Sequence, residues 1–189
     1  AKDMIPEMLK RHKCYGYLTH ELLKDMGTPD RLDKLVKHYA GISPTKKKNV
    51  IFLDRDGTLN KITKGSYITS SDDLELIDGA GEGCRILREL GYLLVLITNQ
   101  PVLARGDVSY DELKLIHNRL DWQLAKQEAY LDYKFYCPHH PDRGYEGEVA
   151  NLKTDCECRK PGIGMLTEAS MLFNIDLEKS WMVGDSLSD

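Results

Sequence analysis

The feature that most constrains this chain is the alternation of short, continuously apolar runs with stretches whose apolar residues recur at helical spacing. The runs predict strands at 49–53, 93–97, 133–136 and 181–183, and the stretches between them predict helices at 78–91, 109–124 and 165–173. A strand that is apolar on both sides is typical of a sheet buried on both faces. We therefore expect an α/β fold, with a doubly wound parallel sheet covered by helices on both faces.

Composition limits the class of protein. The chain has 189 residues, of which 41% are hydrophobic, and a net charge of -4 at pH 7, which suits a globular domain rather than a disordered chain. Its longest apolar run is far shorter than the roughly 20 residues that a membrane-spanning helix needs. No secretory leader is visible in residues 1–10. We therefore expect a cytoplasmic protein with no membrane partner.

Charge divides the chain into two parts. Residues 1–49 carry more basic than acidic side chains, and the remaining residues carry more acidic than basic ones. The change falls near the segment 43–48, so we expect an appendage over residues 1–44 and a separate domain over residues 45–189. The three lysines at 46–48 lack a basic face or interleaved aromatic residues, which favours a solvated linker and no nucleic-acid partner.

Polar residues follow the predicted strands. Asp54 and Asp56 come one residue apart after the first strand, an arrangement that is costly unless a cation or a reaction uses it, although Asp-Gly is also a common turn. Other polar residues lie at turns on the same edge of the predicted sheet, namely Thr98–Asn99, Arg159–Lys160 and Gly184–Asp185. Ligands of parallel sheets bind at this edge, beyond the carboxyl ends of the strands. Together they predict a phosphoryl-transfer site, in which one carboxylate attacks phosphorus, another exchanges protons, and Mg²⁺ and a lysine balance charge.

A second cluster is rich in cysteine. Cys137 precedes two adjacent histidines, and Cys156 and Cys158 follow after a polar segment. Three thiolates and one imidazole suit a tetrahedral Zn²⁺, and four protein ligands would make the ion structural. His139 or His140 could be the fourth ligand, and the spacing together with the resemblance described below favours His139. The alternative is three free thiols with an incidental histidine.

These motifs resemble those of the haloacid dehalogenase superfamily of phosphotransferases, through DxDGT, a strand-terminal Thr, an isolated Lys and GDxxxD in order. The resemblance implies that Asp54 is the nucleophile, that it forms an aspartyl phosphate, and that Asp56 is the general acid and base. It implies that Thr98 and Lys160 bind the transferring phosphoryl group.

The same resemblance implies a magnesium site. The ligands would be the side chains of Asp54 and Asp185 and the backbone carbonyl of Asp56, with Asp189 behind them. It also implies a helix and a strand after Asp189, so we expect a truncated domain.

The zinc motif narrows the resemblance to a subgroup without a cap domain, which contains histidinol-phosphate phosphatases and heptose bisphosphate phosphatases. The chain looks most like the latter across DRDGTLN, ITNQ, LDWQLA, YCPHHP and CECRKP, and the long segment 142–155 favours a sugar phosphate as the small-molecule partner. Histidinol phosphate, or a non-catalytic zinc-stapled fragment, are the alternatives. The resemblance gives as candidate substrate contacts Arg55, Asn60, Asn99, Gln100 and Arg159. Pro101–Val102 departs from the Ser-Gly pair that is usual in the subgroup.

The amino-terminal part resembles the carboxyl end of a sugar-1-phosphate nucleotidyltransferase. The residues that carry this are DMGTP at 25–29, followed by an amphipathic helix that Thr28 caps and Pro29 begins. Asp25 alone cannot support nucleotidyl transfer, so the resemblance implies a remnant of a fusion to a nucleotidyltransferase. The alternative is a simple turn and packing role.

Overall fold

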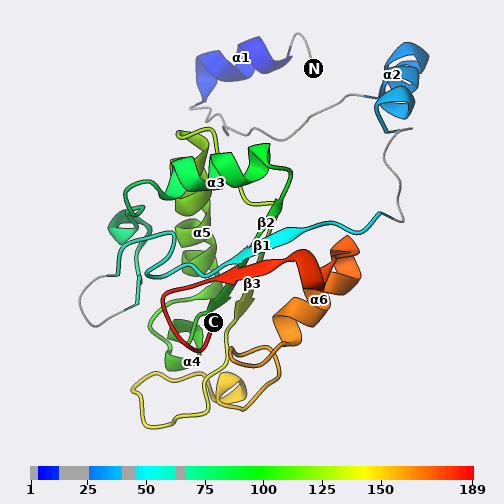
Figure 1. The fold of residues 1–189 in the computed structure, drawn as a ribbon. Helices are drawn as coiled ribbons and strands as arrows, with labels where there is room; N and C mark the ends of the chain where they lie inside the picture. Colours follow the sequence, from blue (N-terminus) through cyan, green and yellow to red (C-terminus); the bar gives the residue numbers. More distant parts are fainter. Residues whose placement is uncertain (1–3, 13–25, 40–45, 63–66) are drawn as a thin grey trace.

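A computed structural model describes residues 4–12, 26–39, 46–62 and 67–189 (Figure 1). The elements in chain order are α1 (Met4–Arg11), α2 (Pro29–Tyr39), β1 (Val50–Leu53), η1 (Ser71–Asp73), α3 (Ala80–Glu89), β2 (Leu93–Asn99), α4 (Val102–Arg105), α5 (Tyr110–Ala125), β3 (Tyr133–Cys137), η2 (Ala150–Leu152), α6 (Gly164–Phe173), η3 (Leu177–Lys179) and β4 (Trp181–Val183). Within these ranges, no helix combines the length and apolarity needed to cross a membrane.

The four strands form one parallel sheet in the order β3-β2-β1-β4. The first strand thus lies inside the sheet, and the chain adds strands first on one side of it and then on the other. This confirms the predicted doubly wound sheet. β2 runs to Asn99 and not only to Ile97, so Thr98 and Asn99 are its last residues rather than the start of a turn.

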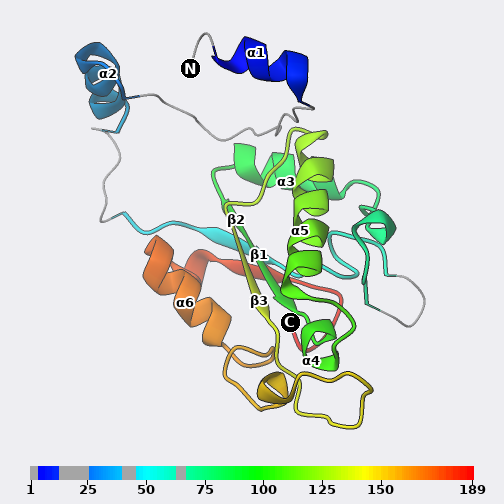
Figure 2. The ribbon, with the colours of Figure 1, turned by 180° about the vertical axis from the view of Figure 1, so that it is seen from behind.

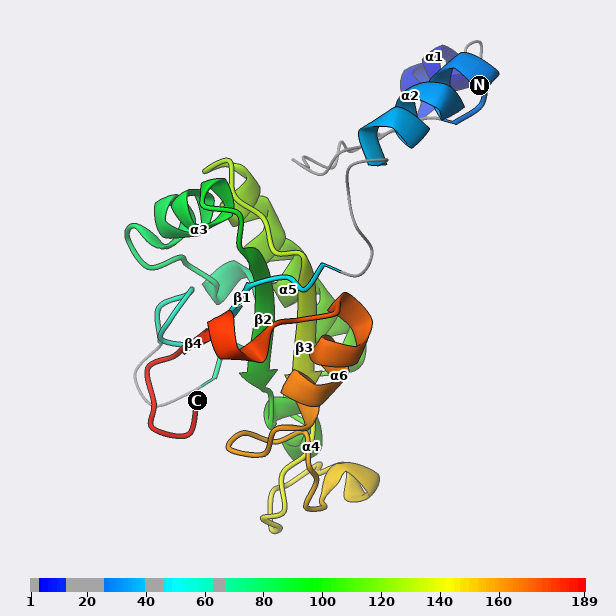
Figure 3. The same cartoon turned by 45° about the vertical axis from the view of Figure 1, so that its right-hand side comes forward.

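Side chains of alternate strand residues enter two separate cores. Ile51 and Leu53 pack with α3 and α5, whereas Val50 and Phe52 pack with α6. Figures 2 and 3 show α3 and α5 on one face of the sheet and α6 on the other. The continuously apolar strand sequence is explained by this two-sided burial.

The three predicted helices are present, with ends set by local chemistry. Ser109 and Glu112 form the predicted capping box at the start of α5. α3 ends just before Gly91, whose positive φ of 89° suits a helix stop. The short helix α4 was not predicted, because four residues after Pro101 are too few to show a helical stripe.

The amino-terminal part is described only in pieces. α2 begins at Pro29 as predicted, but Leu32 and Val36 of its apolar stripe are 46% and 58% exposed. Helix α1 was not predicted. Asp25 and the predicted boundary at residues 44 and 45 lie outside the described residues. The nucleotidyltransferase resemblance therefore stays a prediction.

Candidate active site

A cavity of about 1020 Å³ opens at the edge of the sheet where the strands end. Its lining includes eight of the residues that follow or end strands: Asp54, Asp56, Thr98, Asn99, Arg159, Lys160, Asp185 and Asp189. β1 and β4 deliver the aspartates, β2 delivers Thr98 and Asn99, and the loop between β3 and α6 delivers the two basic residues. Parallel strands bring these distant segments to one edge, which is why the sequence predicted a common site.

Asp54 and Lys160 form the centre of this edge. The Lys160 ammonium donates to Asp54 Oδ1 at 2.7 Å, and it also contacts the carboxylate of Asp189. Burial raises the pKa of the Asp54 carboxyl above its ordinary value, although the Lys160 charge opposes the shift. The ion pair keeps Asp54 available as a carboxylate in a poorly solvated position.

Three carboxylates converge beside the lysine. One oxygen each from Asp54, Asp185 and Asp189 lies within 4.8 Å of the others. A set made only of oxygen donors is what Mg²⁺ prefers, and like charges this close favour a shared cation. Asp189, which the sequence placed behind the direct ligands, lies in the same group as the other two.

Asp56 sits in a cage of hydrogen-bond donors. Its Oδ1 accepts from Arg55 Nε at 3.1 Å and from Asn60 Nδ2 at 3.0 Å. Its Oδ2 accepts from Arg55 Nη2 at 2.9 Å and from Gln100 Nε2 at 3.0 Å. Burial opposes ionisation of Asp56, but the Arg55 charge and these donors together outweigh it and lower its pKa.

Three predicted substrate contacts belong to this cage and not to the cavity wall. Arg55, Asn60 and Gln100 are all 0% exposed, and none of them lines the cavity. In the described structure all three side chains donate to Asp56, and their contact with the substrate stays a prediction. The sequence cannot tell a residue that contacts the substrate from one that holds Asp56, because both kinds of residue occur at the same positions of the motifs.

Both polar atoms of the Asn99 side-chain amide form hydrogen bonds within the protein. Its Nδ2 donates to the backbone oxygen of Lys160 at 3.1 Å, and its Oδ1 accepts from the Lys160 amide at 3.0 Å. The side chain thus fastens the loop that carries Lys160 to the end of β2. Thr98, beside it in the strand, lines the cavity and accepts from Gln100 Nε2 at 2.9 Å.

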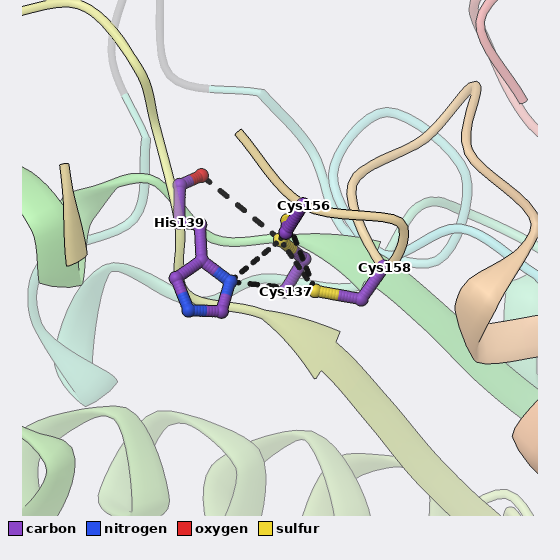
Figure 4. Close-up of side chains that lie close together, drawn as sticks. All are labelled: Cys137, His139, Cys156 and Cys158. Carbon is purple, nitrogen blue, oxygen red and sulfur yellow. Dashed lines mark hydrogen bonds between the residues drawn. The ribbon is translucent and has the colours of Figure 1, made fainter. Parts of the chain in front are cut away.

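The cysteine cluster assembles as the spacing predicted (Figure 4). Four possible metal-ligand atoms lie within 4.8 Å of one another, one each from Cys137, His139, Cys156 and Cys158. The sulfur of Cys156 lies 3.4 Å from that of Cys137 and 3.2 Å from that of Cys158, too far for a disulfide and close enough to share an ion. The imidazole of His139 faces the sulfurs through Nδ1, 3.4 Å from the Cys158 sulfur.

His140, the other histidine, points elsewhere. It is 8% exposed, and its Nδ1 accepts from the Asp142 amide at 3.2 Å. Burial and then the charges of Arg159, Arg105 and Lys153 lower its pKa. The structure thus favours His139 as the ligand, in agreement with the sequence.

The comparisons with known proteins bear on this arrangement. No family model matches the chain. It is 43% identical over 145 residues to D-glycero-beta-D-manno-heptose-1,7-bisphosphate 7-phosphatase of Yersinia pestis, covering 77% of this chain and 74% of that one. It is 47% identical over 139 residues to the enzyme of the same name from Haemophilus influenzae, covering 74% and 72%. The chain belongs to the heptose bisphosphate phosphatase family.

A solved structure of the family agrees with the fold. It is D,D-heptose 1,7-bisphosphate phosphatase from B. bronchiseptica in complex with magnesium and phosphate, with a TM-score of 0.64 and 34% identity, covering 74% of this chain and 72% of that one. The chain therefore has a haloacid dehalogenase-like fold, as the sequence predicted. These relatives are phosphatases, and the site described above has the carboxylates that such an enzyme needs.

Sequence reasoning missed part of this family member's cavity wall. Arg105, the last residue of α4, lines the cavity together with Tyr67, which lies just beyond the undescribed residues 63–66. The guanidinium carbon of Arg105 lies 5.4 Å from the centre of the Tyr67 ring and 4.9 Å from that of Tyr145. No motif pointed to Arg105, although an arginine five residues beyond Gln100 in a strand-end segment was a signal that could have been used.

The segment 142–155 is held against α4. The Val149 amide donates to the Ala104 carbonyl at 3.0 Å. Gly106, with φ of 77°, passes so close to Gly147 that a Cβ on it would lie 2.1 Å from the Gly147 carbonyl oxygen. The cysteine cluster therefore holds the two ends of this segment, and α4 holds its middle. Arg159 and Lys160 follow Cys158 directly in the sequence.

Proposed function

We propose that this chain is a Mg²⁺-dependent phosphatase that removes the 7-phosphate from D-glycero-D-manno-heptose 1,7-bisphosphate. The observation that carries the proposal is the pair of inequivalent carboxylates in one cavity. Asp54 is paired with Lys160 at 2.7 Å, while Asp56 is held by Arg55, Asn60 and Gln100. The substrate is taken from the family relatives named above.

In the first step, a carboxylate oxygen of Asp54 attacks phosphorus. The bond from phosphorus to the C7 oxygen breaks, an aspartyl phosphate forms, and Asp56 gives a proton to the departing alkoxide. Lys160 and Thr98 both line the cavity, and in this proposal the Lys160 ammonium and the Thr98 hydroxyl hold the oxygens of the transferring group.

In the second step, water attacks the phosphorus of the aspartyl phosphate. Asp56 takes a proton from this water, inorganic phosphate leaves, and the Asp54 carboxylate is restored. The lowered pKa of Asp56 favours its carboxylate form, so Asp56 takes up the proton that it gives in the first step before the substrate reacts, and the attacking water returns a proton to it in the second step. Its four hydrogen bonds also fix the orientation of the carboxylate.

Both metals fit the residues present. Mg²⁺ would be held by Asp54 and Asp185 with the backbone carbonyl of Asp56, and when bound it neutralises phosphoryl charge. Asp189 also belongs to the carboxylate group. Zn²⁺ would be held by Cys137, His139, Cys156 and Cys158; it would supply structure alone, because four protein ligands leave no open position.

Phosphate release from a panel of esters, with and without Mg²⁺, tests the proposed activity. We expect Mg²⁺-dependent release from the bisphosphate, and a kcat/KM for it at least about tenfold above that for histidinol phosphate. Asp54→Asn should reduce turnover by several orders of magnitude, because an amide is a very poor nucleophile. Equal or better turnover of histidinol phosphate would assign the chain to the alternative substrate. Retention of about a tenth of the activity by Asp54→Asn would refute the nucleophile.

A further inference from the structure

Arg105 lines the cavity, and its charge has no carboxylate partner among the described residues. No ion pair or side-chain hydrogen bond involves its guanidinium in the described residues, and its Nε is buried without a hydrogen-bond partner. Arg55 and Arg88, by contrast, donate to the carboxylates of Asp56 and Asp132. A half-buried guanidinium without a counterion is costly unless an anion from outside the chain joins it.

The surroundings of Arg105 hold it in one place. Tyr67 and Tyr145 contribute two rings within 5.4 Å and 4.9 Å of its guanidinium carbon, a range in which a ring face attracts a cation. The backbone beside it is fixed by the hydrogen bond from Val149 to Ala104. A guanidinium held in this way loses little conformational freedom when it binds a ligand, so more of the interaction appears as affinity.

The cavity is larger than one phosphate needs. Its volume of about 1020 Å³ is at the upper end of the range for small-molecule sites. Asp54, Lys160 and the other carboxylates occupy the part where phosphorus reacts. Arg105 lies in the part of the lining that α4 contributes, and Arg159 adds a second cation to the same cavity.

We propose that Arg105 binds a second anionic group, a phosphate monoester on the end of the substrate that is not hydrolysed. The planar guanidinium can donate two parallel hydrogen bonds to such a group. This inference rests on the proposed function, because it concerns the leaving-group side of that substrate. Asp107 also lines the cavity, but it is exposed and forms no ion pair with Arg105 within the described chain.

The same charge gives a physical reason for specificity. A bisphosphate presents an anion at both ends, whereas histidinol phosphate presents an ammonium group and an imidazole on the side away from its ester. A fixed cation attracts the former and repels the latter, and the effect is strengthened in a partly desolvated cavity. Arg105 thus selects substrate through the group that does not react.

Binding on an Asp54→Asn background tests the subsite without turnover. Titration calorimetry with the full chain and Mg²⁺ compares the heptose 1,7-bisphosphate with the heptose 7-phosphate, which lacks only the second anion. We expect the bisphosphate to bind about 10- to 100-fold more tightly, as charged hydrogen bonds imply, and Arg105→Gln to remove most of that ratio. Affinity for the monophosphate should stay the same.

Arg143→Gln is the matched control. Arg143 lies in the neighbouring loop, its Nη2 donates to the Lys153 carbonyl at 3.4 Å, and it does not line the cavity. This variant removes the same charge and should keep the ratio. The proposal is overturned if Arg105→Gln leaves the affinity ratio of the two esters unchanged, or if it weakens the binding of both esters equally. It is also overturned if the Asp54→Asn protein binds the two esters with the same affinity.

Kinetics on the active protein separate this failure from failure of the proposed function. If the chain hydrolyses the 7-phosphate but Arg105→Gln lowers kcat/KM equally for bisphosphate and monophosphate, the function stands and the subsite is refuted. If neither ester is hydrolysed, the function fails, and the binding ratio alone decides the subsite.

Discussion

The same substitution at two aspartates two residues apart should have opposite effects on stability. Asp54→Asn and Asp56→Asn each replace a carboxylate by an amide of nearly equal size, at positions that line one cavity. The surroundings differ in kind. Asp56 faces only donors, whereas Asp54 faces one lysine and two other carboxylates.

For Asp56→Asn, the cost comes from the buried arginine. Arg55 is 0% exposed, and Asp56 is the only ion-pair partner of Arg55 in the described chain. Removing one partner of a buried ion pair costs about 3–5 kcal/mol, because the other charge stays buried. The new amide NH₂ would also point at a donor, either Gln100 or Asn60. We therefore expect a loss of about 3 kcal/mol or more in unfolding free energy.

For Asp54→Asn, the sign is reversed. The pKa of Asp54 is raised in the folded protein, so the ionised carboxylate is less favourable there than in the unfolded chain at pH 7. Removing that charge relieves repulsion within the carboxylate group, and Lys160 keeps Asp189 as a partner. The change in unfolding free energy should be close to zero or stabilising, within about 1 kcal/mol.

Urea denaturation at pH 7 without added Mg²⁺, with zinc retained, measures both variants against the parent protein. The midpoints and slopes give unfolding free energies that are comparable if the slopes agree. The reasoning is refuted if Asp56→Asn loses less than about 1 kcal/mol, or if the two variants are destabilised equally.

Two further predictions concern the zinc motif and a buried histidine. One equivalent of zinc should copurify, and Cys158→Ser should lower both the melting temperature and the affinity for phosphate through Lys160; freshly prepared protein without zinc would contradict this. Burial and then the charges of Arg55 and Lys134 lower the pKa of His117 to about 3 in the folded protein, while Asp56 opposes them. Below pH 6.5 the unfolded chain therefore binds a proton at this histidine that the folded protein does not, and stability falls. Stability should drop by about 2 kcal/mol more between pH 6.5 and pH 5 in the parent than in His117→Gln, and equal pH dependence would exclude this histidine.

The fold was predictable because each strand carries a strong local signal. A run such as Val50–Leu53 is apolar at every position, and the structure buries all four residues. Local sequence does not show where β2 ends, because Thr98 and Asn99 are polar yet continue the ladder with β3. Nor does it reveal α4, whose first three residues are fixed by tertiary packing with Leu152 and Tyr67.

The site was predictable in its residues but not in all of their partners. The carboxylates and the cysteine cluster come together because parallel strands end at one edge. Burial, however, depends on the third dimension. Arg55 looks like a cationic substrate contact in the sequence, yet packing turns it inward onto Asp56. Arg105 has no motif, and its place in the cavity wall beside Tyr67 and Tyr145 is seen only in the structure.

The central claim is tested most directly by following the two esters of heptose 1,7-bisphosphate separately. Phosphorus NMR resolves the C1 phosphate, the C7 phosphate and inorganic phosphate in one sample. With Mg²⁺ and the full chain, we predict loss of the C7 signal with matching growth of inorganic phosphate, while the C1 signal persists and Asp54→Asn shows no change. Release of the C1 phosphate first, or no release at all, would contradict the account.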